Sequence, residues 1–135
     1  MRFVKLSSED IEKVNHFYES VMGYASHGLF YREGYMMGEA VATLSEKHPD
    51  DFFGSASQIL KGRGWVEDIE FHFRTAVAHG SIEAFKSENP NCHRLRGIVK
   101  CLYEKKNKKR MECKEVECTS MGSDQCTFVL EEVKL

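Results

Sequence analysis

The residues best suited to chemistry lie in the C-terminal half of the chain, where cysteines and an acid recur at short spacings. The segment EVECTSMGSDQC, residues 115–126, places Glu115 three residues before Cys118 and ends on Cys126. Cys92 stands earlier, at the start of CHRLRGIVKCLYEKK. Three thiolates and one carboxylate make a four-coordinate tetrahedral set, which suits zinc. Four protein ligands leave no position for a substrate water, so the predicted site is structural rather than hydrolytic.

The elements around these residues must bring them together. The run KRMECKEVECTSMGSDQCTFVLEEVKL predicts two strands joined by a turn at Gly122, which places Cys118 near Cys126. Only the start of the preceding helix then has to dock on the hairpin. Residues three apart in a regular strand point to opposite faces, so Glu115 and Cys118 can converge only through a bulge or a twist at the strand end. The alternative is that all five cysteines are simply buried hydrophobic residues.

Composition limits the class of protein. The chain has 135 residues, of which 41% are hydrophobic and 30% charged, and we expect a single globular domain over residues 1–135. A net charge of −2 offers no broad surface for nucleic acid, so no direct nucleic acid binding is expected. No apolar run reaches the roughly 20 residues of a membrane span, and the N-terminal sequence does not resemble a signal peptide. We therefore expect a cytoplasmic protein, in which reduced cysteines favour a metal site or burial over disulfides.

Helices are predicted for the first half of the chain. The segment SSEDIEKVNHFYESVMG predicts a helix capped by Ser7 or Ser8 and ended by Gly23. HGLFYREGYMMGEAVATLSEK is also helical in period, and FFGSASQILK predicts a shorter helix. The glycines of the second helix, at positions 28, 34 and 38, indicate close approach either by another backbone or by a ligand.

Strands are predicted in the second half of the chain. Ile69, Phe71 and Phe73 alternate as in a half-buried strand, GSIEAFKSENPN predicts a turn and a short helical piece, and CHRLRGIVKCLYEKK predicts another helix. This order indicates an α+β fold, with N-terminal helices packed on an antiparallel sheet, a C-terminal helix and a β-hairpin. Cys101 and Cys113 follow the apolar spacing of their elements and are predicted to be small core residues.

The segment CHRLRG, followed further on by EVECTSMGSDQCTFVL, resembles the 4-vinyl reductase, or hydrocarbon-binding, domain family. The family pattern is a Cys-His-x-x-x-Gly helix start, then Glu-x-x-Cys, a glycine turn and Cys-x-Phe. In this sequence the pattern falls on Cys92, His93, Gly97, Glu115, Cys118, Gly122, Cys126 and Phe128. GLFYREGYMMGEAV also resembles the glycine-punctuated helix of this family, and the core motif spans about residues 65–131.

The resemblance implies a domain related to transport-protein-particle subunits and to the ligand-sensing domains of aromatic-responsive transcription activators. In those sensors a small phenolic ligand binds beside a zinc ion held by three cysteines and a glutamate, which here correspond to Cys92, Cys118, Cys126 and Glu115. The family name refers to a proposed reductase step in bacteriochlorophyll synthesis. The sequence shows no nicotinamide fingerprint, flavin motif or obvious acid/base pair, so no catalytic residue is predicted and family membership gives only weak support for reduction.

The leading hypothesis is a domain that senses an apolar or aromatic small molecule and carries a structural zinc. The ligand is expected in a mostly apolar pocket between the glycine-rich helix and the strand at 69–73, although the same side chains could simply fill the core. A homodimer built by the N-terminal helices is expected to pass the signal to a partner. One alternative is a protein-assembly module of the trafficking-subunit type, and another is an accessory protein or reductase in tetrapyrrole metabolism. The residues predicted to line the pocket are Phe30, Tyr31, Tyr35, Trp65, Phe71 and Phe73.

Overall fold

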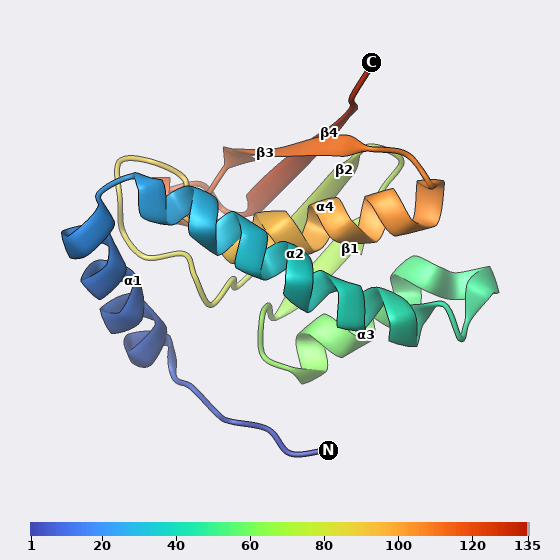
Figure 1. Cartoon of the computed structure of the whole chain (residues 1–135), viewed down its shortest axis with the longest axis horizontal. Helices are drawn as coiled ribbons and strands as arrows, with labels where there is room; N and C mark the ends of the chain where they lie inside the picture. Colours follow the sequence, from blue (N-terminus) through green and yellow to red (C-terminus); the bar gives the residue numbers. More distant parts are fainter. Residues whose placement is uncertain (135) are drawn as a thin grey trace.

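The computed structural model describes residues 1–134, in which helices come first, followed by strands, a further helix and a hairpin (Figure 1). The helices are α1 (Ser8–Met22), α2 (Ala25–Ser45), α3 (Phe52–Gly62) and α4 (His93–Asn107), with short 3-10 turns η1 (Pro49–Asp51) and η2 (Thr119–Met121). The strands are β1 (Asp68–Phe71), β2 (Thr75–His79), β3 (Met111–Glu117) and β4 (Cys126–Glu132). The predicted α+β fold is confirmed. None of the helices in the described chain is both long and apolar enough to span a membrane.

The strands form one antiparallel sheet in the order β1-β2-β4-β3. One face of α4 packs on this sheet and another packs against α2, so α4 lies between α2 and the sheet (Figure 1). The core side chains Leu95, Ile98, Val99 and Leu102 of α4 are therefore fully buried. Close packing on two faces holds the helix firmly in place. It also fixes the position of Cys92, which immediately precedes α4.

The first helix begins and ends where the sequence predicts. Ser7 is the N-cap of α1: its hydroxyl accepts the N–H of Asp10 at 3.1 Å, and the Asp10 carboxylate accepts the N–H of Ser7 at 3.0 Å. This reciprocal pair is a capping box, which satisfies two backbone donors at the helix start. Gly23 ends the helix with φ +61°, a conformation that glycine adopts without strain.

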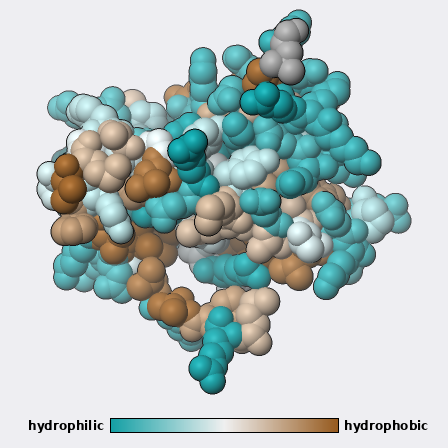
Figure 2. Space-filling model, in the orientation of Figure 1, coloured by the Kyte–Doolittle hydropathy of each residue, from teal (hydrophilic) through white to brown (hydrophobic). Residues whose placement is uncertain are grey.

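α1 leaves an apolar face uncovered. Brown, hydrophobic atoms gather on the left of the molecule in Figure 2, where α1 and the start of α2 lie in Figure 1. Asn15 is the buried residue of α1, and Tyr18 meets Phe30 of α2 edge to face with ring centroids 6.1 Å apart. The apolar side chains of α1 that remain between 38% and 69% exposed are Val14, Phe17, Tyr18, Val21 and Met22.

Glycines let α2 and α4 touch backbone to backbone. A Cβ atom added at Gly34 would overlap the main-chain carbonyl of an α4 residue, and one at Gly97 would overlap a main-chain carbonyl of α2. A Cβ at Gly38 would lie 2.8 Å from the Cβ of Cys101. These two α2 glycines therefore face another helix rather than a ligand. α3 and α4 also separate α2 from β1, where the sequence predicted a pocket.

The strand predicted through Phe73 ends earlier. β1 stops at Phe71, and residues 72–74 form the turn into β2. The turn closes because the N–H of His72 donates to the carbonyl of Thr75 at 2.8 Å. Phe73 is therefore 83% exposed at the tip of a hairpin, instead of sharing the buried face of the strand. Alternation of apolar residues alone does not reveal this turn.

Residues 80–92 form an irregular loop instead of the predicted short helical piece. The N–H of Ser87 donates to the carbonyl of Ser120 at 3.0 Å, and the Ser120 hydroxyl donates to the carbonyl of Asn89 at 3.2 Å. Backbone groups that a helix would satisfy internally are thus paired with η2. These bonds fasten the loop to the β3–β4 hairpin.

The contact between α2 and α4 can be tested with one methyl group. We expect Gly34→Ala to lower the free energy of unfolding by about 1–3 kcal/mol, because the helices must move apart to admit the Cβ. The matched control is Gly28→Ala in the same helix, where an added Cβ meets nothing within 4 Å. That variant should keep its stability or gain up to ~1 kcal/mol from helix propensity. Chemical denaturation followed by circular dichroism measures both, and equal stabilities would contradict the packing described here.

Candidate metal centre

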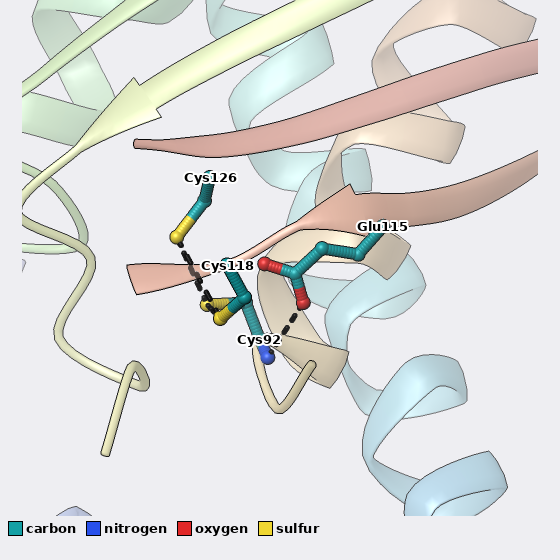
Figure 3. Close-up of side chains that lie close together, drawn as sticks. All are labelled: Cys92, Glu115, Cys118 and Cys126. Carbon is teal, nitrogen blue, oxygen red and sulfur yellow. Dashed lines mark hydrogen bonds between the residues drawn. The ribbon is translucent and has the colours of Figure 1, made fainter. Parts of the chain in front are cut away.

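Four side chains from three parts of the chain meet at one end of the sheet (Figure 3). Cys92 immediately precedes α4, Glu115 lies in β3, Cys118 directly follows β3 and Cys126 begins β4. Three sulfur atoms and a carboxylate oxygen, one from each residue, all lie within 4.8 Å of one another. The structure therefore brings together the four residues that the sequence suggested as metal ligands.

A bulge in β3 makes this convergence possible. Glu115 is paired with Phe128 and Glu117 with the next residue of β4, Thr127, so the register shifts at the intervening Val116. The extra residue turns the end of β3, and the side chains before and after it reach the same side. This is the irregularity that the three-residue spacing between the carboxylate and the thiol requires.

The geometry of the cluster fits a metal ion. Each pair of sulfur atoms is 3.8 Å apart. Tetrahedral metal–thiolate bonds of about 2.3 Å would put the sulfurs about 3.8 Å apart, so the triangle has the required size. Glu115 accepts the N–H of Cys92 through Oε1 at 3.0 Å, whereas its Oε2 is buried without a hydrogen-bond partner among the described residues. A buried carboxylate oxygen without a partner is unfavourable, and a bound cation would satisfy it.

The charges of the cluster also favour a cation. Hydrogen bonds from the other two thiols lower the pKa of Cys118. The hydrogen bond with Cys118 is the largest cause that raises the pKa of Cys92 and that brings the pKa of Cys126 to about 12. Burial, and then the charge of Cys118, raises the pKa of Glu115 to about 8. The thiolate of Cys118 is thus stabilised by the neighbouring thiols, whereas deprotonation of the other three ligands is unfavourable in the absence of a cation. A divalent cation would lower the pKa of all four ligands, because it binds their deprotonated forms.

Polar groups outside the cluster hold the sulfur atoms in place. The Ser81 hydroxyl lies 3.2 Å from Sγ of Cys92, and the backbone N–H of Thr119 donates to Sγ of Cys126 at 3.5 Å. Contacts of this kind orient metal ligands before the ion binds. They come from the two segments, residues 80–92 and η2, that are already joined by hydrogen bonds.

A buried acid beside the cluster was missed from the sequence. Glu83 is 1% exposed, and its carboxylate accepts the N–H groups of Arg94 at 3.2 Å and Leu95 at 2.8 Å. It also lies 3.5 Å from the Arg94 guanidinium. Burial raises the pKa of Glu83 to about 7, although the backbone donors and Arg94 favour its charged form. The feature of the sequence that could have revealed it is an acid between the apolar residues of SIEAF, a segment predicted to form a short helical piece.

Arg94 connects α4 with both N-terminal helices. Its guanidinium donates to Oδ1 of Asn15 in α1 at 2.7 Å and lies 4.2 Å from the ring centroid of Phe30 in α2. It is also 3.6 Å from the more exposed carboxylate of Glu33. One buried side chain therefore joins α1, α2, α4 and, through Glu83, the loop at 80–92.

The remaining two cysteines are core residues, as predicted. Cys101 and Cys113 are 0% and 2% exposed, and neither belongs to the cluster. Burial raises the pKa of both thiols to about 12, as expected for uncharged packing residues. All five cysteines are free thiols.

Three of the aromatic residues predicted to contact a ligand lie on α2. Phe30 is buried and lines a cavity described below. Tyr31 lies against α4, with the Arg96 guanidinium 3.8 Å from its ring centroid. The hydroxyl of Tyr35 donates to the Glu104 carboxylate at 2.7 Å, which also places this side chain against α4.

The other three aromatic residues predicted to contact a ligand do not lie on α2. Trp65 and Phe71 pack on the core, and Phe71 stacks on Phe53 with ring centroids 4.9 Å apart. Phe73 is at the exposed hairpin tip. The structure therefore distributes the six predicted aromatics over several environments, because α3 and α4 lie between α2 and β1.

A cavity of about 310 Å³ lies between α1, the start of α2, residues 85–91 and the start of α4. Three imidazoles, from His16, His27 and His93, contribute to its lining. His27 stacks on His93 with ring centroids 4.1 Å apart, and its Nε2 is 2.9 Å from the carboxylate of Glu19. Nε2 of His93 is buried and has no hydrogen-bond partner within residues 1–134. Burial and the nearby His27 lower the pKa of His93 to about 3.

The fold and the cluster together define the class of protein. Residues 78–132 match the V4R domain, and this stretch contains all four residues of the cluster. For these residues, the match agrees with the resemblance to the 4-vinyl reductase family that the motifs predicted. No protein of curated function matches the sequence.

Two solved structures share the fold. One is the phenol-responsive sensory domain of the transcription activator PoxR, crystallised with phenol, with a TM-score of 0.83, 16% identity and coverage of 98% of this chain and 77% of that chain. The other is a vinyl-4-reductase family protein from Methanocaldococcus jannaschii, with a TM-score of 0.64, 18% identity and coverage of 99% of both chains. At these identities the similarity is one of fold.

The buried Glu83–Arg94 pair gives a prediction for stability. At pH 8, above the raised pKa of Glu83, we expect Glu83→Ala to lower the free energy of unfolding by about 3 kcal/mol or more, because it leaves a buried guanidinium and two backbone donors without their partner. Glu33→Ala removes the exposed partner of the same arginine and should cost less than ~1 kcal/mol. Urea denaturation of the two variants measures the difference. A small loss in Glu83→Ala would show that the pair is not needed to hold the loop.

Proposed function

We propose that this chain is a small-molecule sensing domain built around a structural zinc ion held by Cys92, Glu115, Cys118 and Cys126. The observation that carries the proposal is the triangle of sulfurs with 3.8 Å edges beside a buried carboxylate oxygen that has no partner among the described residues. Soft thiolates favour zinc over magnesium or calcium. Four protein ligands leave no open coordination position, so the ion would support the fold.

The bound ion would supply a cross-link between distant parts of the chain. Cys92 stands at the start of α4, and the other three ligands belong to the β3–β4 hairpin. Without the ion, the polar contacts between these parts within the cluster are the hydrogen bond from the Cys92 N–H to Glu115 and the 3.8 Å contacts of the Cys92 thiol with the other two thiols. The same cross-link would hold the C-terminal end of the loop at 80–92, because Cys92 is its last residue. The middle of this loop is bonded to η2.

The sensing part of the proposal is supported by the V4R match and by the shared fold. The PoxR domain responds to phenol, and the shared fold covers 98% of this chain and 77% of the PoxR chain. We therefore propose a small aromatic ligand for this chain too. Of the six aromatics predicted to contact the ligand, Phe30 lines the 310 Å³ cavity and is the contact that we retain.

A second candidate is a protein-assembly module, and a specific observation favours it. The apolar face of α1 is exposed, and such a face is typical of a surface that binds another protein. A homodimer through α1 would cover it. Assembly and sensing are compatible, since a dimer face on α1 adjoins the cavity that α1 also lines.

The zinc proposal predicts the composition of the purified protein. Native mass spectrometry of reduced, untagged protein should find one zinc per chain, and it reports the number of subunits in the same spectrum. Cys118→Ser should lose the zinc and unfold at a distinctly lower temperature, because the binding free energy of a structural metal is largely folding free energy. A chelator should destabilise the parent protein and have no further effect on Cys118→Ser.

The control for this experiment is Cys101→Ser, which changes a buried cysteine outside the cluster. It should keep its zinc and its sensitivity to chelator, although burying a hydroxyl costs some stability. Absence of zinc from the parent protein, or equal zinc content in the two variants, would refute the assignment.

The sensing proposal predicts a rise in melting temperature with a small aromatic compound. A ligand that binds the folded state alone stabilises it in proportion to the logarithm of its concentration. Zinc-loaded protein should therefore melt at a higher temperature with at least one member of a panel of phenols, alkylbenzenes and quinones. If the whole panel leaves the melting temperature unchanged while native mass spectra show a dimer, the assembly module replaces sensing as the function.

A further inference from the structure

We propose that one end of the molecule is a docking surface for an anionic lipid bilayer. This surface, which we call the basic end, consists of residues 105–110, at the end of α4, and residues 72–74, at the tip of the β1–β2 hairpin. It contains the run KKNKKR, in which five of the six residues are cationic, and the exposed side chain of Phe73. The inference goes beyond the proposed function and depends neither on the zinc ion nor on a sensed ligand.

Polar contacts hold the two segments of the basic end together. Oε2 of Glu132 lies 3.6 Å from the Arg74 guanidinium and 3.6 Å from Nζ of Lys109. The hydroxyl of Tyr103, in α4, donates to the carbonyl of His72 at 2.6 Å. The hairpin tip and the end of α4 therefore form one surface, at the end of the sheet where β3 begins and β4 ends (Figure 1). The metal cluster lies at the other end of these two strands, where β3 ends and β4 begins.

Positive charge is concentrated at the basic end although the whole chain has a net charge of −2. The acid Glu132 is shared between two cations, and the Glu104 carboxylate already accepts the Tyr35 hydroxyl and the N–H of Met111. In a cluster of this kind each cation raises the affinity for an anionic bilayer about fivefold. The exposed cations of the run are Lys105, Lys106, Lys108, Lys109 and Arg110.

Lys108 occupies a position that local stability does not explain. It caps α4 in the left-handed conformation, with φ +55° and ψ +41°, and it is the non-glycine residue with positive φ within residues 1–134. Glycine or asparagine is favoured at such a helix end. The dipole of α4 accounts for cations in its last turn, but not for those that follow the helix. A strained lysine in the middle of the run indicates that its charge serves a function.

Phe73 adds an apolar group beside these cations. Its ring is 83% exposed at the hairpin tip, and the Arg74 guanidinium carbon lies 5.0 Å from the ring centroid. A single exposed apolar side chain is common on proteins. An aromatic ring on a projecting turn, with cations next to it, can enter the interfacial layer of a bilayer while the cations contact the headgroups.

The same features favour a bilayer over a nucleic acid. Proteins bind single strands in grooves where several aromatic rings stack on successive bases, whereas Phe73 is the single aromatic residue of the basic end and stands on a projecting turn. Four of the five cations in the run are lysines. Lysine is a point charge that suits dispersed headgroups, and it lacks the planar fork with which arginine reads bases.

The charge at the other end of the molecule would orient it on the bilayer. α1 contains four acids and one lysine, and it lies on the opposite side of the molecule from the end of α4 (Figure 1). An anionic surface repels α1 and attracts the basic end. The exposed apolar face of α1 would therefore point away from the bilayer and stay open to a partner.

The test is co-sedimentation of the full-length, zinc-loaded protein with lipid vesicles. One set of vesicles contains phosphatidylcholine alone, and the other contains equal parts of phosphatidylcholine and phosphatidylglycerol. We expect binding to the anionic set alone, and a loss of affinity of more than tenfold between about 0.05 M and about 0.5 M NaCl, because salt screens exposed charges.

The charge variant combines Lys108→Gly with Lys109→Ala, and it should bind anionic vesicles about 25-fold more weakly than the parent. Its control combines Lys5→Ala with Lys13→Ala, which removes the same charge from exposed positions near the N-terminus and should change the affinity less than about twofold. Lys108→Gly alone should melt at the same or a higher temperature, since it relieves the positive φ. Weaker binding without lower stability is the signature of a functional charge.

Insertion of the hairpin tip is measured by fluorescence. Phe73→Trp should show a blue shift of its emission when anionic vesicles are added, because the indole leaves water. The control is Phe3→Trp, which places the same reporter at a 65% exposed position on the N-terminal segment and should show no shift. The parent protein, which contains Trp65, supplies the background.

Each remaining outcome contradicts the proposal. Equal binding to neutral and anionic vesicles, unchanged binding of the lysine variant, or vesicle binding without a blue shift in Phe73→Trp would overturn it. Salt-sensitive binding to an RNA oligonucleotide or to polyglutamate, without binding to anionic vesicles, would replace the bilayer by a nucleic acid or an acidic protein. If the lysine variant does not fold, the vesicle and salt dependence of the parent and the emission of Phe73→Trp decide the matter.

Discussion

The first turn of α4 has backbone N–H groups that face the interior, and the need to satisfy them shapes this end of the molecule. Two carboxylates do so: Glu115 accepts from Cys92, and Glu83 accepts from Arg94 and Leu95. Negative charge is also favoured there by the helix dipole. One carboxylate comes from β3 and the other from the loop before α4, so the same requirement positions the hairpin, the loop and the thiol of Cys92.

Arg94 connects the first turn of α4 to the two N-terminal helices. Arg94, held by Glu83, extends to Asn15 of α1 and to Phe30 of α2. α1 otherwise exposes an apolar face, so this buried arginine is a principal link between that helix and the core. A ligand in the neighbouring cavity would contact α1, α2 and the loop at once. Ligand binding would therefore stabilise the position of α1, and α1 is the helix whose exposed apolar face is available to a partner.

Much of the fold and of the cluster could be predicted from the sequence. Capping residues located α1, and the spacing of Glu115, Cys118 and Cys126 predicted a hairpin with either a bulge or a twist at the strand end, of which the structure has the bulge. The glycines of α2 were recognised as points of close approach, but their partner could not be named, because Gly34 meets α4 through a tertiary contact between helices far apart in sequence. Glu83 was missed for the same reason: the acid in SIEAF is visible in the sequence, but its role depends on a tertiary contact with Arg94.

The bulge at Val116 has a consequence beyond the metal centre. β3 forms one edge of the sheet, where unpaired backbone groups invite a strand from another molecule. The irregular register and the exposed charges of Glu112, Lys114 and Glu117 along this strand hinder such an addition. The distortion that aligns a carboxylate with a thiol thus also protects the protein against aggregation through its open edge.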